Sequence, residues 1–255
     1  SYFCLSLELL TFSTNVSEQF HNFCLEILPD NSAHTEIYQA LICGSSLQNP
    51  LYLQLFQGLG LVHLFVVSGW HLNLIAYFCG KFLSNRKFQY FLTLPLLFYA
   101  LSCQWRPPVV RALFNYILRT YSQSYYTNSF RTIWLCGNFC LILFPQWWHS
   151  LSLQLSWWAS LILCLRGSIF IKLSLIFLGL HLLMHPIFNA NPFYVLSSLL
   201  LTPILSYLLF PLTLLSAIWQ NFTPISDSVW NLFIKAAQLI EAQPIVLFNY
   251  SALSI

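Results

Sequence analysis

The sequence has very little charge. Asp, Glu, Lys and Arg make up 7 % of the 255 residues, whereas a soluble domain carries about a quarter. So few charges cannot cover the surface of a water-soluble particle. Intrinsic disorder is excluded too, because disordered chains are poor in apolar and aromatic residues, and here 58 % of residues are hydrophobic and 18 % aromatic. The composition predicts a protein whose solvent is lipid.

The few charges are unevenly placed. Five of the seven acids fall in the first 36 residues, the first basic residue is Lys81, and only Asp227 and Glu241 are acidic thereafter. The basic region of a signal peptide is missing from the start. Because the chain begins at Ser1, we expect it to be part of a longer protein. We predict an acidic, partly amphipathic external segment at 1–37, which could be the end of a larger external domain, and a transmembrane domain at 38–255.

Cysteine and histidine patterns give no metal site. The eight cysteines contain no CxxC pair, so neither a zinc knuckle nor a disulfide framework is predicted. Cys136 and Cys140, four apart in an apolar run, are interpreted as helix-packing residues. His181 and His185 resemble half of a zinc site, but no third ligand accompanies them. We therefore predict no metal and no cofactor.

Long apolar runs dominate the rest of the chain. A membrane helix needs about 20 mostly apolar residues, with about 17 as the lower limit. We predict an all-α fold, a polytopic membrane helical bundle of six to eight segments, at 59–83, 88–105, 107–121, 130–148, 151–166, 168–188, 192–219 and 228–242. Pro203 and Pro211 are expected to break the seventh run, and the last one is a candidate for the membrane interface. The sequence has no internal repeat of fixed period, which argues against an inverted-repeat transporter.

The basic residues predict the orientation. Seven of the ten fall on one side of an up-and-down threading, which the positive-inside rule makes cytoplasmic; they are Lys81, Arg86, Lys87, Arg119, Arg131, Arg166 and Lys172. The acidic start and the turn at 147–149, whose Trp pair fits an interfacial belt, are then external. Within 18–28, the apolar residues at 20, 23, 24, 27 and 28 form a stripe at helical spacing. This pattern predicts an amphipathic helix on the outer surface or one packed against a neighbouring domain.

Polar residues interrupt two predicted spans. His63, Ser68, His71 and Asn73 lie at membrane depth in the first, where Gly69 permits close backbone approach. Three interpretations stay open: hydrogen bonds between helices, a catalytic dyad of Ser68 and His71, which share a helix face, or the lining of a translocation path. Gln154, with Ser152 and Ser156 beside it, adds neutral polar groups at the start of another span.

Arg111 is the second unusual feature. It follows Pro107-Pro108, a strong signal for the start of a helix, so Arg106 lies just outside that helix. A cation at this place opposes the helix dipole by ~0.3–1 kcal/mol. We expect Arg111 to have an anionic or carbonyl partner, and the chain has almost no carboxylates to supply one. Phosphate is a natural external candidate, since guanidinium binds it bidentately; a lipid headgroup or a helix carbonyl end is the alternative.

Four collinear elements resemble those of the ComEC-type competence channel family. The family patterns are Gly-x-x-His-Leu-x-x-x-Ser-Gly-x-His, Tyr-Ala with Pro-x-Val-Arg-Ala, Gln-Leu-Ser, and Leu-Leu-x-x-Pro-x-x-Ser with Pro-Leu. Here they fall on Gly60 to His71, Tyr99 to Ala112, Gln154 to Ser156, and Leu199 to Pro211, so the resemblance covers about residues 38 to 245 in register. Ala40 to Gly44 also matches. Two departures are Ser45-Ser46 in place of charged residues and Ser198 in place of Asn.

The resemblance implies a function. Members of the family pass single-stranded DNA across the bacterial cytoplasmic (inner) membrane during natural transformation, with an external DNA receptor and a cytoplasmic motor as partners. Membrane lipid and a second copy of the chain are further partners to expect. The alternatives are an intramembrane Ser/His hydrolase and a small-solute secondary transporter. We predict a channel rather than an enzyme, because the His-x-His-x-Asp-His motif of the family's metallo-β-lactamase-like domain is missing here. The predicted path-lining residues are His63, Ser68, Gly69, His71, Asn73, Arg106, Arg111, Gln154 and Ser156.

Overall fold

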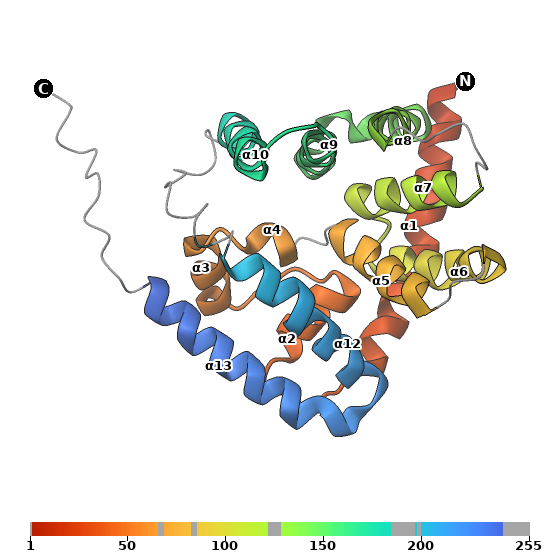
Figure 1. Cartoon of the computed structure of the whole chain (residues 1–255). Coiled ribbons are helices and arrows are strands. Elements are labelled where there is room, and N and C mark those ends of the chain that lie inside the picture. The colour runs from red at the N-terminus through yellow and green to blue at the C-terminus, as the bar shows by residue number, and fades with distance from the viewer. Residues whose placement is uncertain are drawn as a thin grey trace, which may run out of the picture.

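The computed structural model describes residues 2–65, 69–82, 86–121, 129–184, 197 and 200–241. In this part of the chain every regular element is a helix (Figure 1), which confirms the predicted all-α class. The elements are α1 (Tyr2–Ile27), α2 (Thr35–Tyr38), η1 (Gln39–Cys43), α3 (Pro50–Gly58), α4 (Val62–Phe65), α5 (Gly69–Phe82), α6 (Arg86–Ser102), α7 (Pro107–Tyr121), α8 (Ser129–Leu143), η2 (Pro145–His149), α9 (Leu151–Leu163), α10 (Ile169–Met184), η3 (Leu205–Leu209), α12 (Phe210–Ile218), η4 (Gln220–Phe222) and α13 (Thr223–Glu241).

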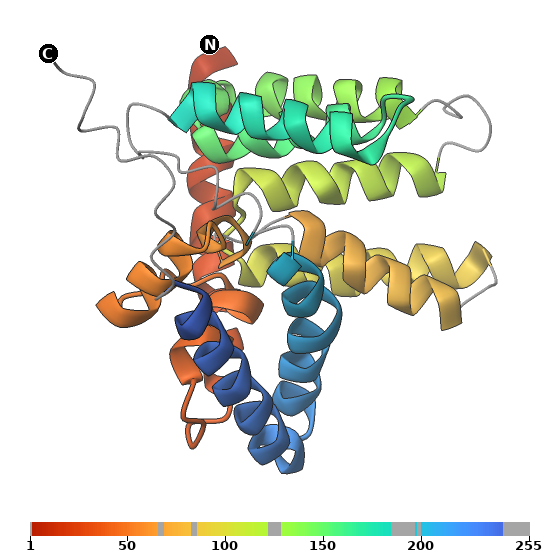
Figure 2. The same ribbon diagram turned by 60° about the vertical axis from the view of Figure 1, so that its left-hand side comes forward.

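Helices α7 to α10 form one region of the molecule. Figure 2 shows α8, α9 and α10 side by side, with α7 running beneath them. Glycines let these helices approach closely: a Cβ on Gly137 of α8 would lie 2.1 Å from the ring of Trp157, and one on Gly179 of α10 would lie 2.0 Å from the ring of Trp158. Two tryptophans of α9 therefore fill notches in the helices on either side of it.

A second region is built from chain segments far apart in sequence. The end of α1, then α2, η1, α3 and α4, pack with η3, α12 and α13 in one hydrophobic core, whose largest side chains include Tyr38, Phe56, Phe210 and Trp230. The Trp230 indole nitrogen donates to the Thr213 hydroxyl at 2.9 Å, which ties α13 to α12. Helix α1 runs from this region to the α7–α10 region (Figure 1).

The predicted spans at 59–83 and 192–219 differ in part from the described helices. The run at 59–83 includes α4 and α5, and Gly60, near its start, takes a left-handed φ of 68° between α3 and α4. Pro203 and Pro211 do not break the run at 192–219 as expected. A π-turn at Leu205–Leu209 lies between them, and its wider hydrogen-bond spacing relieves the need for the proline N–H in the helix ladder.

Membrane-crossing length is met by one helical run in the described residues. Leu200–Ile218 is long and apolar enough to cross a membrane, and shorter apolar helices lie at Gln89–Ser102, Ser129–Leu143 and Leu151–Leu163. The number of membrane segments therefore stays a prediction. The candidate interfacial segment at 228–242 lies largely within α13.

Helix α1 differs from the expected surface helix. It is continuous over 26 residues, and a stripe of Ser17, His21, Cys24 and Leu28 is buried. Phe20 and Phe23 pack edge-on against Phe98 of α6, with ring centroids 5.4 and 6.1 Å away. The predicted apolar stripe thus contains part of the buried face, Cys24 and Leu28, and the polar residues Ser17 and His21 complete it.

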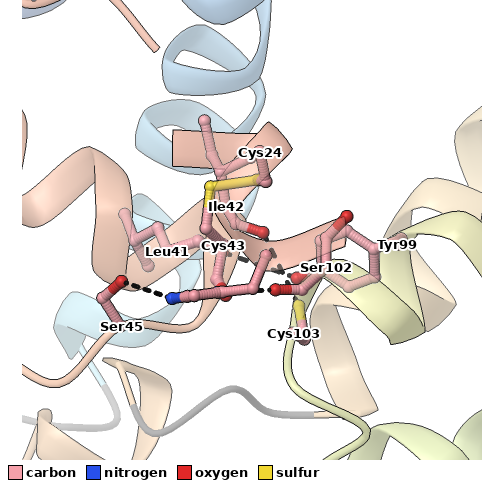
Figure 3. The surroundings of a disulfide bond; sticks show 9 residues. Cys24, Leu41, Ile42, Cys43, Ser45, Tyr99, Ser102 and Cys103 are labelled. Carbon is pink, nitrogen blue, oxygen red and sulfur yellow. Dashed lines mark hydrogen bonds between the residues drawn. A yellow bond between two sulfur atoms is a disulfide. The ribbon is translucent and has the colours of Figure 1, made fainter. Parts of the chain in front are cut away.

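A disulfide joins Cys24 of α1 to Cys43 at the end of η1 (Figure 3), which corrects the expectation from cysteine spacing. His21 lies beside it. Its Nδ1 atom is 3.0 Å from the Cys43 carbonyl oxygen and 2.9 Å from that of Ser102 at the end of α6. The disulfide and the imidazole together fix η1 between α1 and the end of α6.

Candidate functional site

Arg111 lies in the second turn of α7, which begins at Pro107 as the sequence predicts. Its side chain is only 3 % exposed. One terminal nitrogen donates to the Ser156 hydroxyl at 3.0 Å and to the Ser160 hydroxyl at 2.8 Å, both on α9. Its Nε atom is buried and has no hydrogen-bond partner. The partners found are thus neutral hydroxyls, not the anion or carbonyl that we expected.

Among the described residues Arg111 has no carboxylate partner, and the sequence has no Asp or Glu between Glu36 and Asp227. Asn115, one turn further along α7, is also buried, and its Oδ1 atom has no hydrogen-bond partner. Nε of Arg111 can only donate, so the group it lacks is an acceptor. The junction of α7 and α9 therefore holds a cation with hydrogen-bonding capacity that the described residues leave unused.

Gly69 touches α7 next to this cation. A Cβ at Gly69 would lie 2.6 Å from the Pro108 carbonyl oxygen and 2.8 Å from the Ala112 Cβ. Any larger residue would therefore push α5 away from α7. Gly69 sets the distance between these two helices, which is a positioning role rather than the lining role that we predicted.

His71 is fully buried and stacks on Phe210 of α12, with ring centroids 4.3 Å apart and an interplanar angle of 11°. Residues two apart are about 200° apart around a helix, so His71 and Gly69 lie on opposite sides of α5. Consequently His71 and Arg111 do not meet. Asn73 is exposed on the surface of α5.

The other predicted lining residues are also separated. Arg106 is half-buried and donates to the Gln104 amide oxygen at 3.4 Å. Gln154 donates to the Trp148 backbone oxygen at 2.7 Å, while Ser156 binds Arg111. The structure therefore brings together Arg111 and Ser156, adds Ser160, and leaves His71, Asn73 and Gln154 in other places.

Some predictions lie outside the described residues. Ser68 and His185 are among them, and nothing is described of the side chains of His63 and His181. The structure therefore does not test the alternative of a Ser–His dyad or the expectation that His181 and His185 hold no metal. Within the described part of the chain, no group of three or more His, Cys, Asp or Glu is placed to hold a metal ion.

A tryptophan-lined cavity was not predicted. It has a volume of about 360 Å³ and lies between α8, η2 and α9. Five of the nine tryptophans line it, namely Trp134, Trp147, Trp148, Trp157 and Trp158, together with Gln154 and three leucines. From the sequence we interpret Trp147 and Trp148 as interfacial residues. Nothing in their spacing connects them with the other three tryptophans of the cavity.

A polar network around Asp227 was missed as well. Its carboxylate accepts hydrogen bonds from the Ser32 hydroxyl at 2.7 Å, the Tyr38 hydroxyl at 2.8 Å and the Ala33 backbone nitrogen at 3.1 Å. Burial raises the pKa of Tyr38, and the Asp227 carboxylate contributes to the rise. His34 bridges the Tyr52 hydroxyl and the Asn231 side chain. This network fastens residues 32–52 to α13.

Comparison with known proteins gives one family. Residues 45–254 match the family described as Competence protein. An uncharacterized protein of Aquifex aeolicus is 31 % identical over 182 residues, which is 67 % of this chain and 44 % of that protein. The chain thus spans less than half the length of this relative. No solved structure matches the chain.

Proposed function

Since the chain belongs to the competence protein family, which gives it a role in DNA uptake, we propose that it carries single-stranded DNA across the bacterial cytoplasmic membrane. The strand presents one negative charge per phosphate. A passage for it needs cations that attract phosphate, and contacts weak enough for the strand to leave. The proposed function needs no bond-making chemistry from these residues.

Buried Arg111 is the observation that carries the proposal. An ionisable group in a membrane-embedded helix costs several kcal/mol unless it has a partner or faces a pathway. Here, within the described part of the chain, two hydroxyls are the only hydrogen-bond partners and Nε is unused. A phosphodiester supplies the missing acceptors and the missing charge at once, because guanidinium binds phosphate bidentately. No acidic side chain between residues 37 and 226 competes for the cation.

The arrangement in the membrane follows from two markers at opposite ends of α6. Basic residues lie at its start, where Arg86 begins the helix after Lys81 of α5. The disulfide lies at its other end, where His21 contacts the Ser102 carbonyl. Disulfides form in oxidising compartments and basic loops stay cytoplasmic, so both markers support the same orientation. The proposed topology is multi-pass, with residues 38–255 as the transmembrane domain and residues 1–37 on the external side.

The proposed path runs along α7 and α9. Arg106 lies just before α7 on the external side, and Arg111, Ser156 and Ser160 follow at greater depth. His63, Ser68 and Asn73 stay candidates for further contacts, whereas Gly69 and His71 act by holding α5 against α7 and α12. An external DNA receptor and a cytoplasmic motor complete the proposed machinery, and self-association of the chain is part of the same proposal.

Uptake of labelled DNA tests the role of Arg111. In a transformable deletion strain that expresses the full-length protein, Arg111→Ala and Arg111→Lys should each lower uptake about 10- to 100-fold, the factor expected from losing a charge-assisted contact of about 1.5–3 kcal/mol. Lysine should not rescue, because it cannot bind phosphate bidentately. Arg119→Ala, at an exposed arginine of the same helix, is the matched control and should leave uptake unchanged.

The amount of each variant in the membrane is measured by immunoblot, so that a folding defect is recognised. Uptake at the wild-type level in Arg111→Ala, with normal protein, would show that the guanidinium does not contact the strand.

A further inference from the structure

The tryptophan-lined cavity needs a separate explanation. Tryptophan in membrane proteins is enriched at the two membrane–water interfaces, and Trp147 and Trp148 in the turn between α8 and α9 fit that rule. Trp157 and Trp158 do not, since they lie at the middle of α9, about 10 Å from its start at 1.5 Å per residue. The Trp157 indole nitrogen donates to the Ile133 carbonyl oxygen at 3.2 Å, so Trp134, the next residue of α8, lies at the same level.

Packing accounts for only part of this cluster. Trp157 and Trp158 fill the notches at Gly137 and Gly179, and their indole nitrogens bind backbone carbonyls of α8 and α10. Trp134 and Trp148 have no such role, since they are 49 % and 61 % exposed. All four still line one cavity of about 360 Å³, which is in the range of sites for small ligands.

A cation adjoins the cavity. A second cavity of about 350 Å³ is lined by Phe130, Arg131, Trp134 and Leu135. Trp134 therefore lines both cavities. The two cavities, together called the groove here, have lining residues that run from Arg131, near the first residue of α8, to Trp148 in the turn beyond its last. Flat aromatic side chains next to a cation are the combination that holds single-stranded nucleic acid, because bases stack on the rings and phosphate pairs with the charge.

We propose that this groove binds nucleobases of the transported strand, with Trp134 and Trp148 as stacking surfaces and Arg131 as a phosphate contact. The proposal rests on the function proposed above and adds a base-binding site to it. Stacking accepts every base, because each base has a flat π-face, so the site suits transport of any sequence. Gln154, held to the Trp148 backbone, is the polar side chain that lines the groove beside these rings.

Oligonucleotides with and without bases test the proposal. The full chain is purified in lipid nanodiscs, and binding of a fluorescent oligothymidylate is compared with that of an abasic strand of equal length. We expect the thymidylate to bind about tenfold more tightly. Trp134→Leu and Trp148→Leu should reduce its affinity to that of the abasic strand and leave the abasic strand unaffected. Trp219→Leu, at a 60 % exposed tryptophan outside the groove, is the control and should change neither.

The outcomes separate this proposal from the function on which it rests. Equal affinity for the two strands, lost in Arg111→Ala, overturns the base site and leaves DNA transport standing. Binding of neither strand counts against both. Lipid is the competing occupant: if brominated acyl chains quench the groove tryptophans and saturating oligothymidylate does not relieve the quenching, the groove holds lipid and the proposal is wrong. Relief of quenching in the wild type, absent in Trp134→Leu, supports it.

Discussion

The two regions of the molecule satisfy their charged groups to different degrees, with a half-buried carboxylate in one and a buried guanidinium in the other. In the region of α2 and α13, the Asp227 carboxylate receives three hydrogen bonds, two from hydroxyls and one from a backbone N–H. In the α7–α10 region, the Arg111 guanidinium reaches two hydroxyls with one nitrogen, and its Nε has no partner. The hydrogen-bonding capacity of Asp227 is taken by groups of the fold, whereas Arg111 keeps a donor that can bind a ligand.

This difference separates a structural ion from a candidate ligand site. A carboxylate with three donors has little to gain from a ligand, and removing it leaves those donors unpaired. A buried guanidinium without an acidic partner has a desolvation cost that its neutral partners do not repay. The α7–α10 region also contains the tryptophan groove, so both proposed contacts with DNA belong to the region that holds the buried guanidinium without an acidic partner.

The largest expected effect is on stability, and it tests whether the helices of the α7–α10 region are tightly packed. Gly137→Ala places a Cβ 2.1 Å from the Trp157 ring, and overpacking of this kind costs about 1–3 kcal/mol, occasionally more. We expect a marked fall in the thermal unfolding temperature of the purified protein. Gly80→Ala, with no atom within 4 Å of the new Cβ, should be neutral or slightly stabilising. Equal unfolding temperatures for Gly137→Ala and Gly80→Ala would mean that the ring of Trp157 does not fill the notch at Gly137. In that case, adding Trp157→Leu to Gly137→Ala would not restore the unfolding temperature.

The next prediction concerns the sign of the effect at the two charges. Asp227→Asn should lower the free energy of unfolding by about 1–3 kcal/mol, because it weakens three hydrogen bonds to a charged acceptor. Arg111→Met should be neutral or stabilising by about 1 kcal/mol, the lower end of the range found when a buried ion pair is replaced by apolar residues of similar size. Lys235→Met, at an exposed lysine of α13, controls for loss of a charge. Chemical denaturation in detergent measures all three. Equal destabilisation by Asp227→Asn and Arg111→Met would end the contrast and make Arg111 a structural residue.

Local signals made part of the fold predictable. Pro107-Pro108 marks the start of α7 because proline suits the first helical turn, and this alone places Arg111 near the beginning of a helix. The missed details depend on contacts across the chain. Two such details are the left-handed backbone of Gly60, near the start of the first predicted span, and the π-turn within the continuous helix Leu200–Ile218. Neither leaves a trace in hydrophobic periodicity.

The site was less predictable for the same reason. The need of Arg111 for a partner follows from its helix position and from the scarcity of acids, but Ser160 lies 49 residues away and looks like any polar residue of an apolar helix. Gly69 and His71 share a motif and yet lie on opposite sides of α5. The motif shows that the residues occur together and does not show which helix each one faces. The Cys24–Cys43 disulfide likewise depends on how η1 folds back onto α1.

The smallest expected effect is the contribution of the Asp227 network to the pH dependence of stability. Burial raises the pKa of Tyr38 above its ordinary value of 10.0, and Asp227 adds to the rise. A raised pKa in the folded state means that stability is fully present below pH 10 and falls as pH rises above it, because the unfolded chain then loses the proton first. In thermal unfolding between pH 9 and pH 11, Tyr38→Phe should therefore show a shallower loss than the wild type, while Tyr77→Phe, at an exposed tyrosine, should not. The pKa of Tyr52 is raised too, first by burial, so Tyr38→Phe should remove only part of the slope. An unchanged slope in Tyr38→Phe would mean that burial and Asp227 do not raise the pKa of Tyr38. The hydrogen bonds to Asp227 would then be weaker than the contrast with Arg111 requires.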